Sequence, residues 1–506
     1  MRASRLLVAS ALVLVGTIVS GVLGFLVYII AGRELSVSAY GVFNVVMAVT
    51  AFSATLSSLG LRDALPRELA YSRARGWRVE DIVRAALLVV ALASIAVGGL
   101  LAVFSNRLAS FLGVMRYSWS LVLAGLATPS MVLLDLFVAI ARGYGRVMEK
   151  ILVRDVGVYL VLLIGAVLSV FAGLGLIGVL FSYVIAWNLG AVVAALMLWR
   201  AGLLPRPSRV KFDVIVSLLA FSLPLLVSGV AGIVMTYMDT LMLGVFRGAR
   251  EVGLYNAAAP LARIVLLVLG SAGYIVLPLF SEIYAREGAE GLRHVYTIIA
   301  RWIFVATYPL AAAMIAAPRL LVAAVFGRRY LAIAPALAVL AAGFTAHVVA
   351  GFNGITVMVL RETRVVGMVS ILSATVNAVL NVLLIPRLGS LGAAAATAAS
   401  YMLSNALISL WLYKRIRLNP FTKGYLMPLS LAAVLASVLT VAHTLCVLIP
   451  LLVAVETVLG VATLATRDAY EETLIREIAK DLGLEWLAEK LLNIIPRLQW
   501  SQSLDD

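Results

Sequence analysis

Long apolar runs recur along the chain, and short polar stretches separate them. Each run is about as long as the roughly 20 residues that a helix needs to cross the hydrocarbon core of a bilayer. The runs predict about fourteen membrane-spanning helices, at residues 6–31, 39–60, 85–105, 117–141, 155–172, 175–199, 214–243, 254–280, 299–318, 331–359, 366–386, 389–413, 425–446 and 448–466. Strands of a membrane barrel would instead alternate in polarity over stretches of about ten residues. The pattern therefore predicts an all-α polytopic membrane protein.

The composition agrees with this fold class. Hydrophobic residues make up 63% of the chain and charged residues 13%, whereas soluble proteins average about 45–50% and about 25%. The single cysteine, Cys446, excludes an intrachain disulfide. The three histidines lie far apart in the sequence, so we expect no metal site and no bound cofactor.

The positive charge is distributed unevenly between alternate loops. With the N-terminus inside, the inner loops and the C-terminal tail hold thirty of the 40 Lys and Arg residues, and the outer loops hold nine. Cytoplasmic loops retain Lys and Arg, so this asymmetry predicts an even number of spans with both termini in the cytoplasm. The net charge of +15 then reflects topology and contact with anionic membrane lipid. We expect no nucleic-acid partner.

Short motifs recur at an offset of 212 residues. Gly41, the aromatic residue two positions later and Asn44 correspond to Gly253, Tyr255 and Asn256. Such repeats are typical of transporters. They predict two pseudo-symmetric six-helix lobes with two further C-terminal helices: an N-lobe at 1–200 (helices 1–6), a C-lobe at 201–413 (helices 7–12) and helices 13 and 14 at 414–466. We expect the transport path to lie in a cleft between the lobes.

The last segment, 467–506, differs from the rest because it carries nine acidic and five basic residues. Its apolar positions, among them Leu474, Ile478 and Leu482, follow helical spacing up to Pro496. This predicts a cytoplasmic amphipathic tail that lies on the inner membrane surface or packs on the bundle. Docking of a partner protein is the alternative.

Four segments resemble a known family. They are NAVLNVLLIPRLGSLGAAAAT (377–397), VGLYNAAAPLARI (252–264), GRELSVSAYGVFN (32–44) and YMDTLMLG (237–244). They are similar to helices and turns of the polysaccharide and oligosaccharide flippases, the Wzx-like branch of the MOP superfamily. The resemblance covers nearly all of residues 1–466. It implies a transporter in the cell membrane that moves a polyprenyl-(pyro)phosphate-linked oligosaccharide for surface-glycan assembly, by alternating access and without catalytic residues. Membrane lipid and other polysaccharide-assembly proteins are the further partners that it implies.

Basic residues are candidates for binding the lipid phosphate. Arg263 lies about nine residues into the eighth predicted span, about 14 Å deep at 1.5 Å per residue, where a cation needs an anion or a wet cavity. It either binds the phosphate of the substrate or forms a salt bridge with Asp239. Arg62 and Arg67, at the cytoplasmic end of the second span, either receive the head group or act as positive-inside anchors.

Other polar residues inside predicted spans remain. Asn377 and Asn381 lie one turn apart, and they either bond between helices or contact sugar. Asp239, Asp135 and His347 are candidates for gating or for coupling to a proton or sodium gradient, against a purely structural role.

Two other functions fit parts of the sequence. A multidrug or organic-cation antiporter of the same superfamily would favour acidic cavities, which Asp135 and Asp239 keep open and Arg263 opposes. A membrane glycosyltransferase or polymerase of the metal-dependent kind needs paired outer-loop carboxylates, but only Glu34 and Glu251 are available there, on separate loops.

Overall fold

The described part of the chain is mainly helical and contains no strand. A computed structural model describes residues 2–76, 79–206, 208–419, 421, 423–439, 444–481 and 485–495. Its first helices are α1 (Arg2–Glu34), α2 (Val37–Ser57), α3 (Leu61–Ala74), α4 (Glu80–Val103), α5 (Ser105–Phe111), η1 (Met115–Tyr117), α6 (Trp119–Gly143), η2 (Glu149–Gly157), α7 (Val158–Phe171), α8 (Gly175–Arg200) and α9 (Phe212–Arg247). The remaining helices are α10 (Ala249–Ala316), α11 (Pro318–Val325), η3 (Arg328–Ile333), α12 (Ala334–Val349), α13 (Asn353–Val359), α14 (Thr363–Leu388), α15 (Ser390–Ile416), α16 (Lys423–Leu439), α17 (Leu445–Ala465), α18 (Ala469–Asp481) and α19 (Glu485–Ile494). The predicted all-α fold is confirmed.

Twelve helices in the described residues are long and apolar enough to cross a membrane. The two further spans expected from the sequence, 254–280 and 425–446, coincide with the first part of α10 and with α16. Residues 440–443 of the second lie outside the described set. Many large apolar side chains point away from the protein interior, such as Phe171 at 85% and Val103 at 77% exposure. Lipid is the environment that accommodates such a surface.

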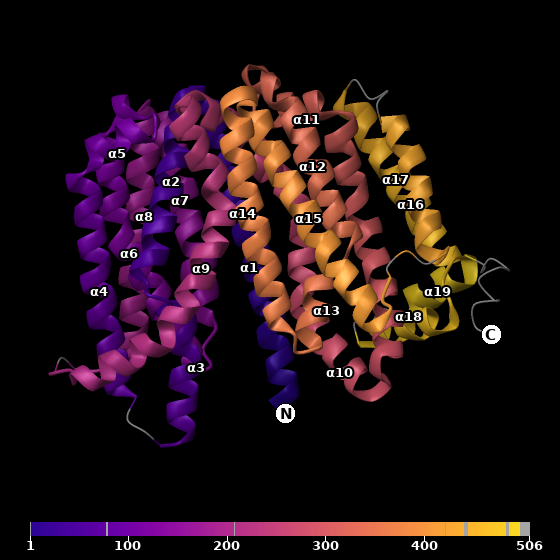
Figure 1. The fold of residues 1–506 in the computed structure, drawn as a ribbon, viewed down its shortest axis with the longest axis horizontal. Helices are drawn as coiled ribbons and strands as arrows, with labels where there is room; N and C mark the ends of the chain where they lie inside the picture. The colour runs from indigo at the N-terminus through magenta and orange to yellow at the C-terminus, as the bar shows by residue number, and fades with distance from the viewer. Residues whose placement is uncertain are drawn as a thin grey trace. The chain divides into compact units, whose positions relative to one another are not determined.

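The helices form two compact units. The first unit contains Met1–Pro260 and Asn377–Ala393, and the second contains Leu261–Val376 and Ala394–Asp506. Helices α10, α14 and α15 therefore contribute residues to both. In the first unit, α4, α6 and α8 lie side by side as long rods (Figure 1). The lobe boundaries drawn from the sequence repeat stay a prediction, because the units follow packing and not internal symmetry.

Residues of the repeat meet inside the first unit, where α2 crosses the start of α10. A Cβ on Gly41 would collide with the carbonyl oxygen of Ala249, and a Cβ on Gly253 would collide with that of Val37. Both pairs of positions are related by the offset of 212. Only glycine permits such a close backbone approach. A single feature, the close crossing of α2 and α10, therefore explains both repeated glycines.

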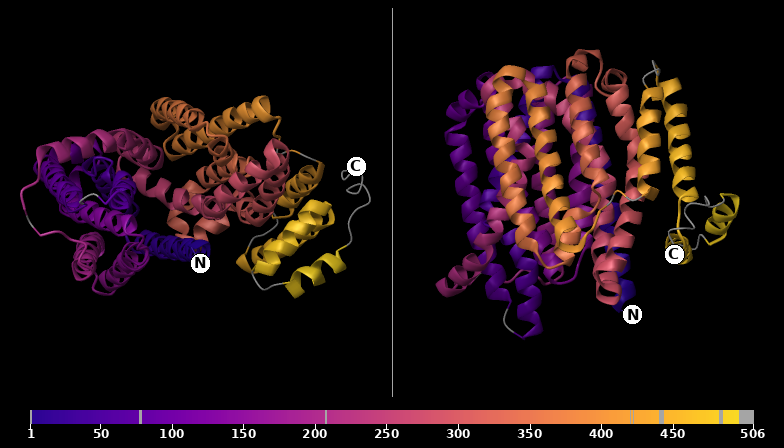
Figure 2. Two further views of the ribbon diagram at one scale, coloured as in Figure 1. Left: turned by 90° about the horizontal axis from the view of Figure 1, so that it is seen from below. Right: turned by 45° about the vertical axis from the view of Figure 1, so that its right-hand side comes forward.

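The C-terminal tail packs against α10 within the second unit. Glu471 is fully buried and forms an ion pair with Arg301, and it accepts a hydrogen bond from Trp302 Nε1 at 2.5 Å. Arg467 donates to the carbonyl oxygen of Leu492 at 2.9 Å. Helices α18 and α19 lie across the lower end of the α16–α17 pair (Figures 1 and 2). These contacts join the tail to α10, while its cytoplasmic location stays a prediction, and Leu482 and Pro496 lie outside the described residues.

Candidate functional site

A cavity of about 340 Å³ lies within the first unit, and we call it the arginine cavity. Residues of α2, α3, α6 and α9 line it: Ala51, Ala54, Thr55, Ser58, Gly60, Arg62, Asp63, Met131, Val132, Asp135, Leu225, Leu226, Gly229, Gly232, Ile233 and Thr236. Space exists here partly because α9 presents glycines to it. A Cβ on Gly232 would meet nothing within 4 Å.

The turn between α2 and α3 positions Arg62. Leu59 and Gly60 both have positive φ, of 48° and 77°, which ends α2 and starts α3 in a new direction. A Cβ on Gly60 would collide with the carbonyl oxygen of Ser222 on α9, so glycine allows the turn to pack against that helix. Arg62 follows directly in the first turn of α3.

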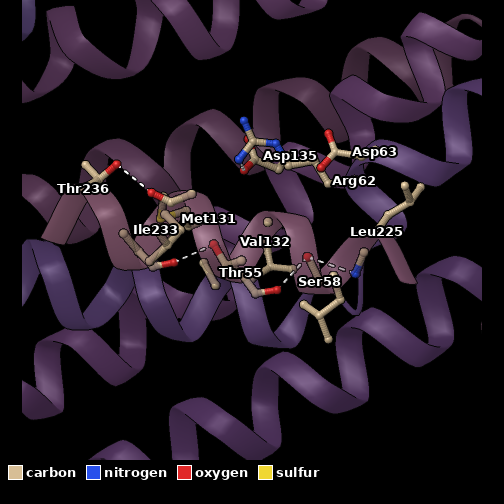
Figure 3. Close-up of a pocket in the computed structure, with 16 residues that line it drawn as sticks. Thr55, Ser58, Arg62, Asp63, Met131, Val132, Asp135, Leu225, Ile233 and Thr236 are labelled. Carbon is tan, nitrogen blue, oxygen red and sulfur yellow. Dashed lines mark hydrogen bonds and ion pairs between the residues drawn. The ribbon is translucent and has the colours of Figure 1, made fainter. Parts of the chain in front are cut away.

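The charged side chains gather at one end of the cavity, where Figure 3 shows Arg62, Asp63 and Asp135 close together and away from Thr236. Arg62 Nη1 lies 3.1 Å from Asp135 Oδ2. Arg154 Nε donates to Asp135 Oδ1 at 2.5 Å. The side chain of Asp135 is 7% exposed and that of Arg62 is 46% exposed. One buried carboxylate therefore holds two guanidinium groups, one of which remains accessible.

Arg62 retains N–H donors that an anion can use. A guanidinium carries five N–H donors in a fork that matches carboxylate and phosphate oxygens. Asp135 engages one nitrogen of Arg62, and the half-exposed remainder is available. The sequence predictions of Arg62 as a phosphate ligand and of Asp135 as a gating residue fall on two residues in direct contact.

Arg67 lies outside this cavity. Its guanidinium carbon sits 5.4 Å from the centre of the Phe221 ring on α9, in a cation–π contact. Arg263 lies half-buried on α10 in the second unit and is not among the residues lining the arginine cavity. Both alternatives for Arg263 stay predictions.

A second polar cluster in the first unit surrounds Asp239. Its Oδ2 accepts a hydrogen bond from the Tyr255 hydroxyl at 2.5 Å, and its Oδ1 accepts one from Asn381 Nδ2 at 2.7 Å. Asn381 Nδ2 also donates to Asn377 Oδ1 at 3.0 Å. The Oδ1 atom of Asn381 is buried and has no hydrogen-bond partner among the described residues. Buried polar atoms are normally paired, so an oxygen left over beside a carboxylate marks this cluster as a candidate ion site.

Comparisons with known proteins agree with this architecture. Residues 7–284 match a family described as polysaccharide biosynthesis protein. The chain belongs to this family. A relative in Haloferax volcanii, a probable low-salt glycan biosynthesis flippase named Agl15, is 23% identical over 74% of this chain and 76% of its own length. An uncharacterised membrane protein of Methanocaldococcus jannaschii, MJ1068, is 25% identical over 40% of this chain and 39% of its own length.

Solved structures share the fold. The lipid II flippase MurJ in an inward closed conformation has a TM-score of 0.71 at 12% identity, covering 92% of this chain and 98% of its own. A multidrug resistance MATE transporter of the MOP superfamily, in an inward-facing conformation, has a TM-score of 0.61 at 17% identity, over 79% and 94%. The relatives and structural neighbours with a stated activity are flippases and transporters, and the predicted resemblance to the flippase branch is confirmed.

Arg154 is not evident as a site residue from the sequence, because it is one of several basic residues in a predicted inner loop. It lies in η2, a π-helical segment that leads into α7. Such segments are rare and often occur at functional sites. The local signal was present in the sequence: an adjacent Arg154–Asp155 pair interrupts an otherwise apolar stretch, ILVRDVGVYL.

Proposed function

We propose that the protein moves a lipid-linked oligosaccharide from the inner to the outer leaflet of the cell membrane by alternating access, without chemical change. The observation that carries this proposal is the half-exposed guanidinium of Arg62 in a cavity of a membrane-spanning unit, held on one side by Asp135. Family membership and the glycan flippase among the relatives support the choice of substrate.

The arginine cavity supplies the positive charge that the hydrocarbon core of the bilayer lacks. A phosphate or pyrophosphate is strongly disfavoured in hydrocarbon unless its charge is compensated. The phosphate competes with Asp135 for Arg62, while Arg154 remains bonded to the carboxylate. Exchange of one anion for another leaves no guanidinium unpaired, so loading and release of the head group both remain reversible.

The cytoplasmic side is assigned by charge. Arg62 and Arg154 belong to the basic stretches 61–84 and 142–154, for which the positive-inside rule predicts a cytoplasmic location together with both termini. A Cys446→Ser background removes the only cysteine. In whole cells, an impermeant maleimide should then label Arg116→Cys and leave Arg75→Cys unlabelled; the reverse pattern would invert the topology.

We propose that the Asp239 cluster couples transport to an ion gradient. Its carboxylate and amide oxygens are ligand types that sodium-like hard cations accept, and a carboxylate can also carry a proton. Asp239→Asn should abolish the dependence of transport on the gradient while leaving downhill exchange. A variant whose rate still follows the sodium or proton gradient would contradict this assignment.

The cation antiporter is the less favoured function, because the arginine cavity holds its buried carboxylate in two ion pairs. A cationic drug would have to displace both guanidinium groups. Gradient-driven ethidium efflux from the same vesicles would favour this alternative.

The decisive assay uses sealed proteoliposomes that contain a fluorescent polyprenyl-pyrophosphate oligosaccharide. A membrane-impermeant quencher reports exposure in the outer leaflet, with protein-free vesicles as reference. We expect Arg62→Gln to lower the rate at least tenfold, since a charged hydrogen bond is worth about 1.5–3 kcal/mol. Arg67→Gln is the matched control, because it removes the same charge from the same helix outside the cavity, and we expect a change within twofold. Wild-type rates in Arg62→Gln would refute the role of the cavity.

A further inference from the structure

A second cavity, also of about 340 Å³, lies wholly within the second unit, and we call it the amide cavity. Parts of α10 and α15 line it, together with the break between α12 and α13. Its polar lining comes from His347, Asn353, Ser404 and Asn405. None of the described lining residues is an Asp, Glu, Lys or Arg. A cavity of this size is within the range of small-ligand sites, roughly 300–1,000 Å³.

The amide side chains are fixed by their hydrogen bonds. Asn405 Nδ2 donates to the carbonyl oxygen of Tyr401 at 2.7 Å, which leaves its Oδ1 to accept from Asn353 Nδ2 at 3.0 Å. Asn353 Oδ1 in turn accepts from the backbone nitrogen of Gly354 at 2.7 Å. Asn353 and Asn405 are 2% and 6% exposed. Neither amide can rotate without breaking buried bonds.

This network also fixes the state of His347. Its Nδ1 lies 2.9 Å from Asn405 Oδ1, and an amide oxygen only accepts hydrogen bonds. His347 Nδ1 therefore carries a hydrogen, and when the ring is uncharged its Nε2 is an acceptor. The imidazole is part of the cavity lining, and an acceptor of this kind suits a hydroxyl donor.

We propose that the amide cavity binds the uncharged, hydroxyl-bearing glycan part of the substrate. Hydroxyl groups both donate and accept, as do the Ser404 hydroxyl and the His347–Asn405 network, and the Phe352 ring supplies an apolar wall. A phosphate finds no cation in this lining, so the cavity selects against charge. The inference rests on the proposed transport of a lipid-linked oligosaccharide and adds a separate glycan site to it.

A purely structural role for the same network has to be separated from binding. Gly351, with a φ of 65°, breaks the helix between α12 and α13, and the amides stabilise the break. That role, however, requires neither the His347 acceptor nor open space. On the α10 side, a Cβ on Gly270 would meet nothing within 4 Å. Substitutions at these two positions therefore test binding with little effect on the break.

The test compares two fluorescent probes in proteoliposomes, polyprenyl pyrophosphate carrying the oligosaccharide and the same lipid without sugar. His347→Leu removes the acceptor, His347→Gln restores an acceptor, and Gly270→Leu fills the space. Thr345→Val is the matched control on α12, because Thr345 bonds only within its own helix, to the carbonyl oxygen of Ala341, and does not line the cavity. Size-exclusion profiles establish that each variant is folded.

We expect His347→Leu and Gly270→Leu to lower the rate for the glycosylated lipid about tenfold and to change the rate for the bare lipid less than twofold. His347→Gln should recover part of the loss, and Thr345→Val should match the wild type. Equal effects on both probes, or none on either, would overturn the glycan site without touching the Arg62 result.

Equilibrium dialysis of the released oligosaccharide against purified protein separates this inference from the proposed function. If the wild-type protein moves neither lipid, the proposed function fails. Binding of the free oligosaccharide that weakens about tenfold in His347→Leu would still establish the amide cavity as a glycan site, and absence of such binding would overturn it.

Discussion

The arginine cavity and the amide cavity have similar volumes, about 340 Å³ each, but opposite lining chemistry. In the first unit a buried carboxylate is paired with two guanidinium groups. In the second unit, buried amides and an imidazole bond to one another without any formal charge. Charge attracts an anion of nearly any shape, whereas fixed amides require donors and acceptors in matching positions. The difference suggests that the arginine cavity recognises phosphate and the amide cavity recognises sugar.

The largest expected difference between the cavities concerns stability. Asp135→Leu removes the carboxylate that Arg154 Nε contacts at 2.5 Å and leaves Arg154, whose side chain is 21% exposed, with only the longer contact to Asp155 at 3.6 Å. Breaking a buried ion pair costs about 3–5 kcal/mol. Asn405→Leu leaves neutral donors unpaired, at about 1–3 kcal/mol. Thermal unfolding of the detergent-solubilised variants should therefore show a larger drop in midpoint for Asp135→Leu. Equal drops would mean that the two networks contribute alike and that charge adds nothing to the first.

The next prediction tests whether a charged pair in the second unit stabilises the docked tail. Arg301 and Glu471 form a buried ion pair that holds the tail against α10. Glu471→Gln should weaken docking of the tail by about 3 kcal/mol, measured as faster tryptic cleavage at Arg476. It should leave the ratio of rates for glycosylated and bare lipid unchanged.

The control for this effect is Glu489→Gln, which loosens a half-exposed pair, 3.1 Å from Arg476 Nε. Exposed pairs contribute at most about 1 kcal/mol, so cleavage should change little. A Glu471→Gln variant with an altered ratio of transport rates would show that the tail acts on the glycan site.

The sequence predicted much of the fold because its physical causes are local. Long apolar runs identify spans wherever a helix must satisfy its own backbone in lipid, and small-residue motifs such as those at Gly41 and Gly253 identify close helix crossings. The two spans outside the twelve found in the structure, 254–280 and 425–446, were equally apolar in sequence. The tail was predicted as amphipathic, but periodicity alone could not choose between the membrane surface and the bundle. The buried ion pair of Glu471 with Arg301 favours packing on the bundle.

The sites were predicted less well because they depend on which helices meet. Arg62 and Asp135 were named separately, and the contact between them could not be read from positions 73 residues apart. Arg154 could not be distinguished from the other basic residues of its predicted inner loop. Asn353 and Asn405 were not singled out, because an amide near the end of an apolar run has no charge to reveal it. The role of His347 in coupling stays a prediction, and its contact with Asn405 could not be read from the sequence.

A smaller expected effect is that only the arginine cavity makes the transport rate depend on ionic strength. Raising ionic strength from 0.1 to 1 M shortens the Debye length from about 10 to about 3 Å, which weakens attraction of a phosphate to the half-exposed Arg62. We expect the transport rate of the glycosylated lipid to fall about threefold in the wild type and in His347→Leu. Arg62→Gln should lose this dependence. If Arg62→Gln keeps the full salt dependence, the electrostatic contribution comes from elsewhere in the chain.

The smallest effect concerns acid release of the tail, outside both cavities. Although burial raises the pKa of Asp468, a hydrogen bond from His294, another from the backbone of Glu471 and nearby positive charge hold that pKa below its usual value. A depressed pKa means that the ionised carboxylate stabilises tail docking above its ordinary value, about 3.9, and that this contribution is lost as the pH falls through the lowered pKa. Wild-type tail docking should therefore weaken only below about pH 4, whereas Asp468→Asn should be weakened equally at neutral pH. Hydrogen exchange of residues 469–481 between pH 3 and pH 7 measures this, after correction for intrinsic rates. Over the same range, binding of the free oligosaccharide to the amide cavity of His347→Gln should not follow the tail, because none of the other described lining residues titrates. If oligosaccharide binding and tail docking were lost over the same pH range, the glycan site would depend on the docked tail. Charged and neutral recognition would then not be separate.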